Sequence, residues 1–215
     1  MTLDRRAFIR ANTKLLAPPL VPEILLHLAE ESLSIWQKTE EEIGALGLPP
    51  PFWAFAWAGG QALARYVLDN AEIVAGRRVL DLASGCGIDA IAAMKAGAKG
   101  ALAADVDPFA AVAARLNAEA NGMSIETTEA DLLPATPRGF EVLLVGDLFY
   151  ERPLAERALA FARAARAEGA EVFVGDPGRS YFPRAAFEEI AQYSVPVTRE
   201  LEDSEIKLTR VWRLA

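Results

Sequence analysis

Apolar residues in the first 75 positions recur mostly at the spacing of helices that bury one face. Pro22 is expected to open one such helix. Its apolar face would comprise Ile24, Leu25, Leu28 and Leu33. Ser34 is expected to cap a second helix that ends near Gly47. The prolines at 49–51 cannot lie inside a helix, and a further helix is predicted over residues 61–68.

After Gly76 the pattern changes to short apolar runs that alternate with amphipathic segments. Strands are predicted at 78–82, 101–106, 125–130, 140–145 and 171–174. Helices are predicted at 85–95, from Pro108 to about Asn121, from Pro153 to Gly169, and around Phe187 and Ile190. Asp107 is the expected N-cap of the helix that begins at Pro108. The last two predicted strands, 193–199 and 205–214, have no helix between them and should form an antiparallel hairpin.

Alternating strands and helices predict an α/β fold with a doubly wound, mostly parallel sheet and right-handed crossovers. The C-terminal hairpin would add antiparallel strands to that sheet. Most dinucleotide-binding dehydrogenases lack such a hairpin at this position. Residues 1–75 are expected to form a helical extension and lid that packs on the core, residues 76–215, so that the chain is one structural unit.

Composition narrows the class of protein. Of 215 residues, 52% are hydrophobic and 24% charged, and no apolar run reaches the roughly 20 residues of a membrane span. A net charge of −8 argues against nucleic acid as the main partner. Cys86 is the single cysteine, which fits a reducing, cytoplasmic location, and no metal site is expected. The basic residues between Arg5 and Lys14 are interpreted as a structural helix rather than a targeting segment.

The loop between the first two predicted core elements has the features of a nucleotide-cofactor site. It runs from Asp81 through Gly85 to Gly87, where glycines allow backbone to approach a ligand. Asp105 ends the next strand and could accept both ribose hydroxyls. A match to the NAD fingerprint is weak, and the Asp81 carboxylate would repel a pyrophosphate but suit the α-amino group of S-adenosylmethionine (AdoMet). The alternative is that Asp81 only caps the following helix.

Several motifs carry a resemblance to a known family. The runs DLASGCG, AADVDP and GDLFY resemble the seven-β-strand protein lysine methyltransferases, whose motif is D-x-F/Y-Y. Within that group, the chain resembles the electron transfer flavoprotein β-subunit lysine methyltransferases over nearly its whole length. The motifs that carry this closer resemblance are RAFIRANTKL, LVPEILLHL, PFWAFAWAGGQALARYVLDN, DLASGCGIDAIAA, GDLFYE and GDPGR.

The resemblance implies the class I AdoMet methyltransferase fold. It also implies an AdoMet-dependent protein-lysine N-methyltransferase, with the electron transfer flavoprotein β subunit as the target and S-adenosylhomocysteine as a product. It implies AdoMet contacts at Trp57, Asp81, Ser84, Gly85, Gly87, Asp105 and Asp131. Asp131 corresponds to the acid that meets the adenine amino group. Ala83 replaces the first glycine of the usual loop, which we expect to change little. A bacterial, cytoplasmic member is expected, because no mitochondrial presequence precedes the matching region.

The D-x-F/Y-Y motif is the expected methyl-acceptor site. Lysine attacks as a neutral amine although its ordinary pKa is near 10.4, so the site must desolvate it or offer a proton path. Asp147 is predicted to orient the amine, with Tyr150 as its catalytic partner and Phe149 and Tyr150 as walls of a narrow substrate channel. Alternatively, the two aromatic residues pack in the core and Asp147 caps a helix. Arg179 is a candidate substrate contact or part of a structural salt bridge.

Two further surface features accompany this site. Trp53 and Trp57 could form a lid over the cofactor, although core packing is an alternative for Trp53. The acidic runs 40–42 and 200–203 are expected to be solvated and could attract a lysine-rich target. Other functions remain open on sequence alone: methylation of another protein, such as a ribosomal protein, or of a small amine; an NAD-dependent oxidoreductase; and a non-catalytic AdoMet-binding module.

Overall fold

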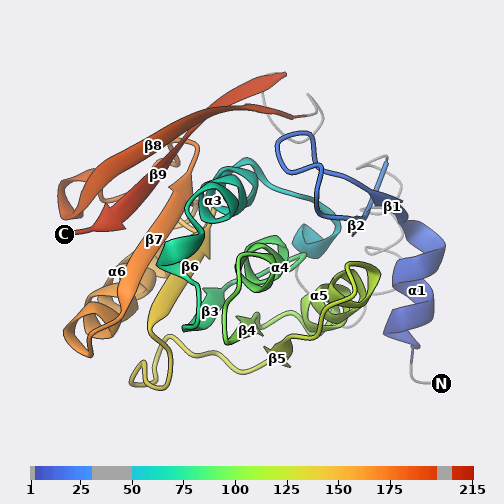
Figure 1. Ribbon diagram of the computed structural model, residues 1–215, viewed down its shortest axis with the longest axis horizontal. Helices are drawn as coiled ribbons and strands as arrows, with labels where there is room; N and C mark the ends of the chain where they lie inside the picture. Colours follow the sequence, from blue (N-terminus) through green and yellow to red (C-terminus); the bar gives the residue numbers. More distant parts are fainter. Residues whose placement is uncertain (1–2, 31–49, 198–204) are drawn as a thin grey trace.

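The computed structural model describes residues 3–30, 50–197 and 205–215, and its centre is a seven-stranded sheet with helices on both faces (Figure 1). The strand order is β5-β4-β3-β6-β7-β9-β8. The strands are β3 (Arg78–Leu82), β4 (Gly100–Ala104), β5 (Glu126–Thr128), β6 (Val142–Gly146), β7 (Glu171–Asp176), β8 (Phe187–Pro196) and β9 (Ile206–Leu214). Strands β3 to β7 are parallel, and β9 pairs antiparallel with both β7 and β8. The predicted class of fold and its C-terminal hairpin are therefore confirmed.

Alternation of side chains along the parallel strands creates two apolar layers. On one face, Val79 of β3 and Leu144 of β6 pack beneath α3 (Ala58–Asp69), α4 (Ile88–Lys95) and α5 (Pro108–Ala120). On the other face, Leu80 and Leu143 pack against α6 (Arg152–Ala167). Strands buried on both faces explain the nearly continuous apolar runs in the sequence.

The helices after β3 and β4 begin where local geometry permits. Gly87 has a left-handed backbone with φ of 76° and is the N-cap of α4, so this helix begins three residues later than predicted. The side chain of Asp107 caps α5 by accepting a hydrogen bond from the Phe109 amide, and Pro108 occupies the first turn. The predicted start of α5, with Asp107 as N-cap and Pro108 at the first helical position, is therefore confirmed.

The prediction of a helix from Pro22 is wrong. Residues Leu26–Leu28 form strand β2, which pairs antiparallel with β1 (Lys14–Leu16). Helix α1 (Arg5–Asn12) precedes β1 in the chain. Side chains on α5 impose this extended form: Asn117 accepts from the His27 amide at 2.6 Å, and Asn121 accepts from the Leu25 amide at 3.0 Å. Tertiary hydrogen bonds thus override the local periodicity.

The prediction of a helix around Phe187 and Ile190 is also wrong. These residues belong to β8, which is preceded by a short 3-10 turn, η4 (Arg184–Ala186). Their spacing of three mimics helical periodicity, but Phe187 packs on the α6 side of the sheet and Ile190 on the α3 side. A register shift between Glu189 and Ala191 marks an irregularity of the ladder with β9.

The described part of the N-terminal segment packs on α5. Phe8 of α1 lies edge-on to Phe109 at 5.5 Å, and Trp53 of η2 (Phe52–Ala54) stacks on the same ring at 5.7 Å. The Trp53 ring is buried in this cluster, as the core-packing alternative expected, and Trp53 also lines a cavity at the carboxyl ends of the strands. Another 3-10 turn, η3 (Ala71–Ile73), links α3 to β3. The predicted helix from Ser34, Leu33 and the acidic runs 40–42 and 200–203 lie outside the described residues.

No helix in the described ranges has both the length and the apolar character needed to cross a membrane.

Candidate active site

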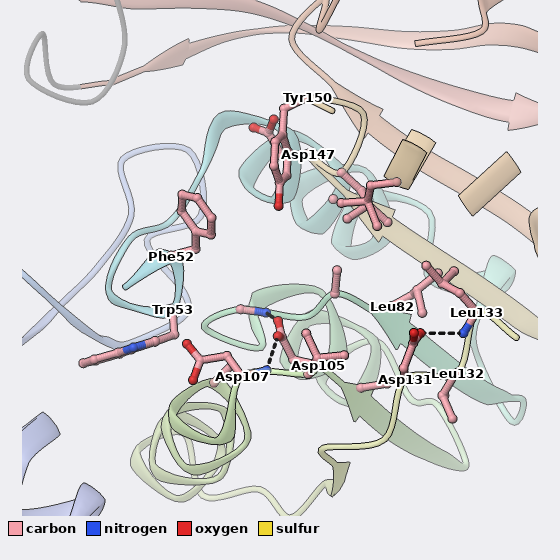
Figure 2. Close-up of a pocket in the computed structure, with 18 of the residues that line it drawn as sticks. Phe52, Trp53, Leu82, Asp105, Asp107, Asp131, Leu132, Leu133, Asp147 and Tyr150 are labelled. Carbon is pink, nitrogen blue, oxygen red and sulfur yellow. Dashed lines mark hydrogen bonds between the residues drawn. The ribbon is translucent and has the colours of Figure 1, made fainter. Parts of the chain in front are cut away.

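A cavity of about 470 Å³ opens at the carboxyl ends of β3, β4 and β6. Ligands in open α/β sheets bind at this edge, near the point where the strand order reverses, and this volume lies within the range of small-molecule sites. Figure 2 shows Asp147 and Tyr150 across the cavity from Asp105 and Asp107, with Phe52 on the N-terminal side. The N-terminal segment therefore contributes to the wall of a cavity built on the sheet.

The loop after β3 supplies one wall of this cavity. Gly85 has φ of 49° and lines the cavity, and its amide donates to Asp105 Oδ2 at 2.9 Å. Gly87 lies behind the cavity, where an added Cβ would come within 2.8 Å of the Ala114 side chain on α5. Ser84 is buried beside the loop, and its Oγ has no hydrogen-bond partner among the described residues. Glycine is thus needed at 85 for the turn and at 87 for helix packing.

Asp105 is the polar centre of the cofactor side. Its two oxygens accept from the amides of Gly85 and Asp107, at 2.9 Å and 3.0 Å. Burial raises the pKa of Asp105, while these two hydrogen bonds lower it. A carboxylate has about four acceptor positions, so Asp105 retains capacity for ribose hydroxyls. The residues present therefore fit the ribose of a nucleoside cofactor.

Asp81 does not line the cavity, contrary to the direct contact that the resemblance implies. Strand alternation directs its side chain beneath α4, where it is 1% exposed and accepts from the Ala90 amide at 3.0 Å. Burial raises the pKa of Asp81 to about 7, that hydrogen bond lowers it, and the charge of Asp105 raises it. Asp81 therefore occupies the helix-capping position of the alternative interpretation.

Asp89 is a buried carboxyl that the sequence analysis missed. It lies on the first turn of α4, is 3% exposed, and its Oδ1 has no hydrogen-bond partner in the described chain. Burial, and secondarily the charge of Asp81, raise its pKa well above the ordinary range. The signal was an acid inside the apolar run I-D-A-I-A-A. Together, Asp81 and Asp89 form an acidic pair behind the glycine loop.

Asp131 lines the opposite end of the cavity and is already engaged. Its Oδ1 accepts from the Leu133 amide at 3.1 Å (Figure 2), and its Oδ2 pairs with Arg157 of α6 at 2.5 Å. Arg157 lines the same cavity and was not predicted. The sequence offered no signal for it, because a surface arginine on an amphipathic helix is ordinary.

Asp147 follows β6 in a left-handed conformation, with φ of 60°. Its Oδ2 accepts from the Gly59 amide at 3.0 Å, and its Oδ1 accepts from Arg179 Nε at 2.5 Å. Asp147 does not cap α6, the helix that follows it, but its bond to Gly59 caps the first turn of α3, so the capping alternative holds for a different helix. The residue joins β6, the first turn of α3 and the turn after β7. The structure thus brings the predicted residues Asp147 and Arg179 together as an ion pair.

Neighbouring aromatic residues divide between cavity and core. Phe149 is 1% exposed and packs edge-on against Phe182 at 5.2 Å, so it does not wall the channel as predicted. Tyr150 lines the cavity at 5.8 Å from the Phe52 ring, and burial raises the pKa of its phenol. Trp57 lines it too and donates its indole N–H to the Phe52 carbonyl. The packing alternative therefore holds for Phe149 and not for Tyr150.

The structure separates the predicted site residues into two groups. Those that line the cavity are Trp57, Gly85, Asp105, Asp131, Asp147, Tyr150 and Arg179. Those that lie behind its wall are Asp81, Ser84, Gly87 and Phe149. These cavity residues follow β3, β4, β5, β6 and β7 or belong to the N-terminal segment, so one cavity has both an acidic side and an aromatic, ion-paired side.

Comparison with known proteins agrees with this architecture. Residues 61–143 match the family model described as ribosomal protein L11 methyltransferase (PrmA). Two solved structures share the fold: ribosomal protein L11 methylase from Lactobacillus delbrueckii subsp. bulgaricus and a tRNA (uracil-54, C5)-methyltransferase from Pyrococcus abyssi in complex with S-adenosyl-L-homocysteine. The first has a TM-score of 0.51 and 22% identity over 74% of this chain and 79% of that one. The second has a TM-score of 0.51 and 21% identity over 71% and 38%.

Relatives at higher identity cover nearly the whole chain. The electron transfer flavoprotein beta subunit lysine methyltransferase of Danio rerio is 36% identical over 98% of this chain and 83% of that protein. Its counterpart from Xenopus laevis is 39% identical over 96% and 85%. The similarity includes the N-terminal segment that helps to wall the cavity. The chain therefore belongs to the electron transfer flavoprotein β-subunit lysine methyltransferase family and is an AdoMet-dependent protein-lysine methyltransferase.

Proposed function

We propose that this enzyme methylates lysine side chains of the electron transfer flavoprotein β subunit. The observation that carries the proposal is similarity of 36% to 39% over nearly the full chain to relatives named for that substrate. The similarity extends beyond residues 61–143, which match a methyltransferase family model with a different named substrate. Residues outside that match, including Phe52, Tyr150 and Arg179, line the acceptor side of the cavity.

We infer the cofactor roles from the geometry of the cavity. Asp105 would accept the ribose hydroxyls, Asp131 the adenine amino group, and the backbone at Gly85 would lie against the ligand. Asp81 would act indirectly, because it caps α4 and so holds the glycine loop in place. When bound, AdoMet would supply a methyl group on a sulfonium: an amine lone pair would form the new N–C bond while the C–S bond breaks and its electron pair stays on sulfur.

The remaining residues would orient the substrate amine. Asp147 would accept an amine N–H, which fixes the direction of the nitrogen lone pair. Tyr150 and Phe52 would border the lysine side chain and exclude water from it. Because Asp147 accepts from Gly59 and Arg179, other groups of the protein hold its carboxylate in place.

The test is incubation of the enzyme with AdoMet and purified electron transfer flavoprotein, followed by peptide mass spectrometry. We expect added methyl groups on lysines of the β subunit. A reaction without enzyme is the control, and equal modification in the two reactions would refute the proposed substrate.

A second candidate substrate is ribosomal protein L11. It is favoured by the match of residues 61–143 and by a ribosomal protein L11 methyltransferase from Bordetella bronchiseptica that is 33% identical over 54% of this chain and 34% of that protein. Running L11 beside the flavoprotein at equal concentration compares the two candidates directly. We expect the flavoprotein to be modified faster.

A further inference from the structure

Arg179 is a cation in direct contact with Asp147, the carboxylate proposed to face the substrate. Its Nε donates to Asp147 Oδ1 at 2.5 Å, and its guanidinium carbon lies 6.0 Å from the centre of the Trp57 ring. The Arg179 side chain is 22% exposed and that of Asp147 is 5% exposed. An ion pair sheltered to this degree is screened less by water and salt than one on an open surface.

Asp147 meets positive charge from a second direction. Its Oδ2 accepts from the Gly59 amide at the start of α3, a twelve-residue helix whose N-terminus carries partial positive charge. The carboxylate therefore lies between a guanidinium and a helix N-terminus.

The turn after β7 is built to hold Arg179 in this place. Asp176 Oδ1 accepts from the amides of Gly178 and Arg179, at 2.7 Å and 2.9 Å. The amide of Asp147 in turn donates to the Gly175 carbonyl at 2.9 Å, which ties the end of β6 to the end of β7. The main chain thus fixes the approach of the guanidinium to the carboxylate.

Among the residues that the structure describes, the titratable groups near this pair include several acids, a phenol and a second ion pair. Asp176 is buried beside Arg179, Tyr150 follows on the same loop as Asp147, Asp105 faces them across the cavity, and Asp89 lies behind Gly146. Arg157, the other described cation that lines the cavity, is paired with Asp131. Arg179 therefore supplies a compensating full charge directly at Asp147.

An uncompensated Asp147 would favour the wrong form of the substrate. A carboxylate stabilises a nearby ammonium and so raises its pKa, whereas only the neutral amine has a lone pair to donate. We propose that Arg179 is a positioning residue that neutralises Asp147, so that the pocket takes up the substrate lysine as a neutral amine. The ammonium gives its proton to solvent on entry, and Asp147 accepts an N–H of the resulting amine. This inference rests on the substrate-facing role proposed for Asp147.

The test is the pH dependence of amine binding, measured by calorimetry with n-butylamine and protein saturated with S-adenosylhomocysteine. Between about pH 7 and about pH 9.5 the neutral fraction of such an amine rises by roughly 300-fold. Because the pKa of Tyr150 is raised, its phenol stays largely neutral over this range. For the wild type we expect the affinity to rise at least about tenfold across that range, within the limit set by the neutral fraction.

Replacement of Arg179 separates the proposal from a purely structural role. In Arg179→Gln, the Asp147 carboxylate has lost the guanidinium and would hold the ammonium form of the amine. The affinity for n-butylamine should therefore change less than about threefold over the same pH range. Arg179→Lys should recover the wild-type pH dependence. Arg210→Gln is the matched control, because the Arg210 side chain is 26% exposed, close to the value for Arg179, and pairs with Glu189 on the terminal hairpin. This variant should behave as wild type.

Three results would overturn the inference. They are identical pH dependence in Arg179→Gln and wild type, tighter wild-type binding near the lower pH, and no saturable wild-type binding at either pH. Should Arg179→Gln fail to bind S-adenosylhomocysteine, Arg179→Met takes its place with the same expectation, since it keeps an apolar stem over Trp57. The probe contains no protein, so a failure of the flavoprotein as substrate leaves this result independent.

Discussion

Two non-glycine residues with left-handed backbones, Ala83 and Asp147, stand at the ends of adjacent strands and border the cavity. For Ala83, such a conformation costs about 1–2 kcal/mol because its Cβ crowds the backbone. Asp147 tolerates it better, since short polar side chains can bond locally. Strain therefore concentrates where the chain turns toward the cofactor and the substrate.

Replacing Ala83 by glycine should raise stability. Relief of about 1–2 kcal/mol exceeds the entropic cost of glycine, about 0.5–1 kcal/mol, so unfolding in urea should require roughly 0.5–1 kcal/mol more. Ala104→Gly at the end of β4 is the control, because Ala104 has no left-handed backbone and the change should destabilise. A loss of stability in Ala83→Gly comparable to that control would contradict the strain argument.

Asp105→Asn should weaken cofactor binding. The substitution removes a charged acceptor from the cavity, and hydrogen bonds to charged groups contribute about 1.5–3 kcal/mol, so affinity for S-adenosylhomocysteine should fall about 10- to 100-fold. Calorimetric titration measures it, with Asp69→Asn on the exposed end of α3 as the matched substitution. Unchanged affinity in Asp105→Asn would remove Asp105 from the cofactor site.

Helix α3 lies very close to the ends of β6 and β7. Gly59 on the helix faces Gly175 on β7, and a Cβ on either residue would overlap the backbone of the other. The same contact lets the Gly59 amide reach Asp147. The glycines in this crossing are therefore structural requirements of the site.

Gly175→Ala should destabilise the protein by about 3 kcal/mol or more, because rigid backbone atoms cannot move aside. Gly100→Ala on β4 is the control, since nothing lies within 4 Å of its added Cβ and its backbone is ordinary. Chemical unfolding of the two variants gives the comparison. Equal stability of the two would show that α3 does not pack as described.

The buried acids beneath α4 predict a pH effect on stability. Because folding raises the pKa of Asp81 to about 7 and that of Asp89 well above its ordinary value, the folded state binds more protons than the unfolded one. Their contribution therefore favours folding at low pH and is lost as pH rises from about 4 toward 7. Asp89→Asn removes one of these groups.

We expect Asp89→Asn to melt at a higher temperature than wild type near pH 8, with a smaller difference near pH 5, because the variant lacks the carboxyl whose raised pKa costs stability as pH rises. Thermal melting at the two pH values measures the difference. An advantage of the same size at both values would mean that folding does not raise the pKa of Asp89.

On the scale of the whole molecule, sequence predicted the parallel core well because its strands are buried on both faces and its helices carry strong caps, as at Asp107. The prediction was wrong at β2, where Asn117 and Asn121 accept hydrogen bonds from the backbone and so decide the conformation. It was also wrong at β8, where pairing with β9 decides the conformation. Those contacts join residues far apart in the chain, and local periodicity does not report them.

The site residues also divide into those that the sequence predicted and those whose positions depend on contacts between distant parts of the chain. Residues that follow strands, such as Asp105 and Asp147, were predicted because the carboxyl ends of the parallel strands meet at one edge of the sheet. Strand alternation turned Asp81 under α4, and packing against Phe182 took Phe149 into the core. The pairing of Arg157 with Asp131 depends on the rotation of α6, which no motif encodes.

The central claim is that one cavity brings AdoMet and a lysine of the flavoprotein β subunit together at Asp147. Its most direct test is lysine-resolved mass spectrometry of that subunit after reaction with wild type and with Asp147→Asn, which suits the left-handed backbone. We predict methylated lysines with wild type and at least about a 100-fold slower reaction with the variant, whose affinity for S-adenosylhomocysteine stays within about threefold. Equal rates, or methyl groups on residues other than lysine, would contradict the account.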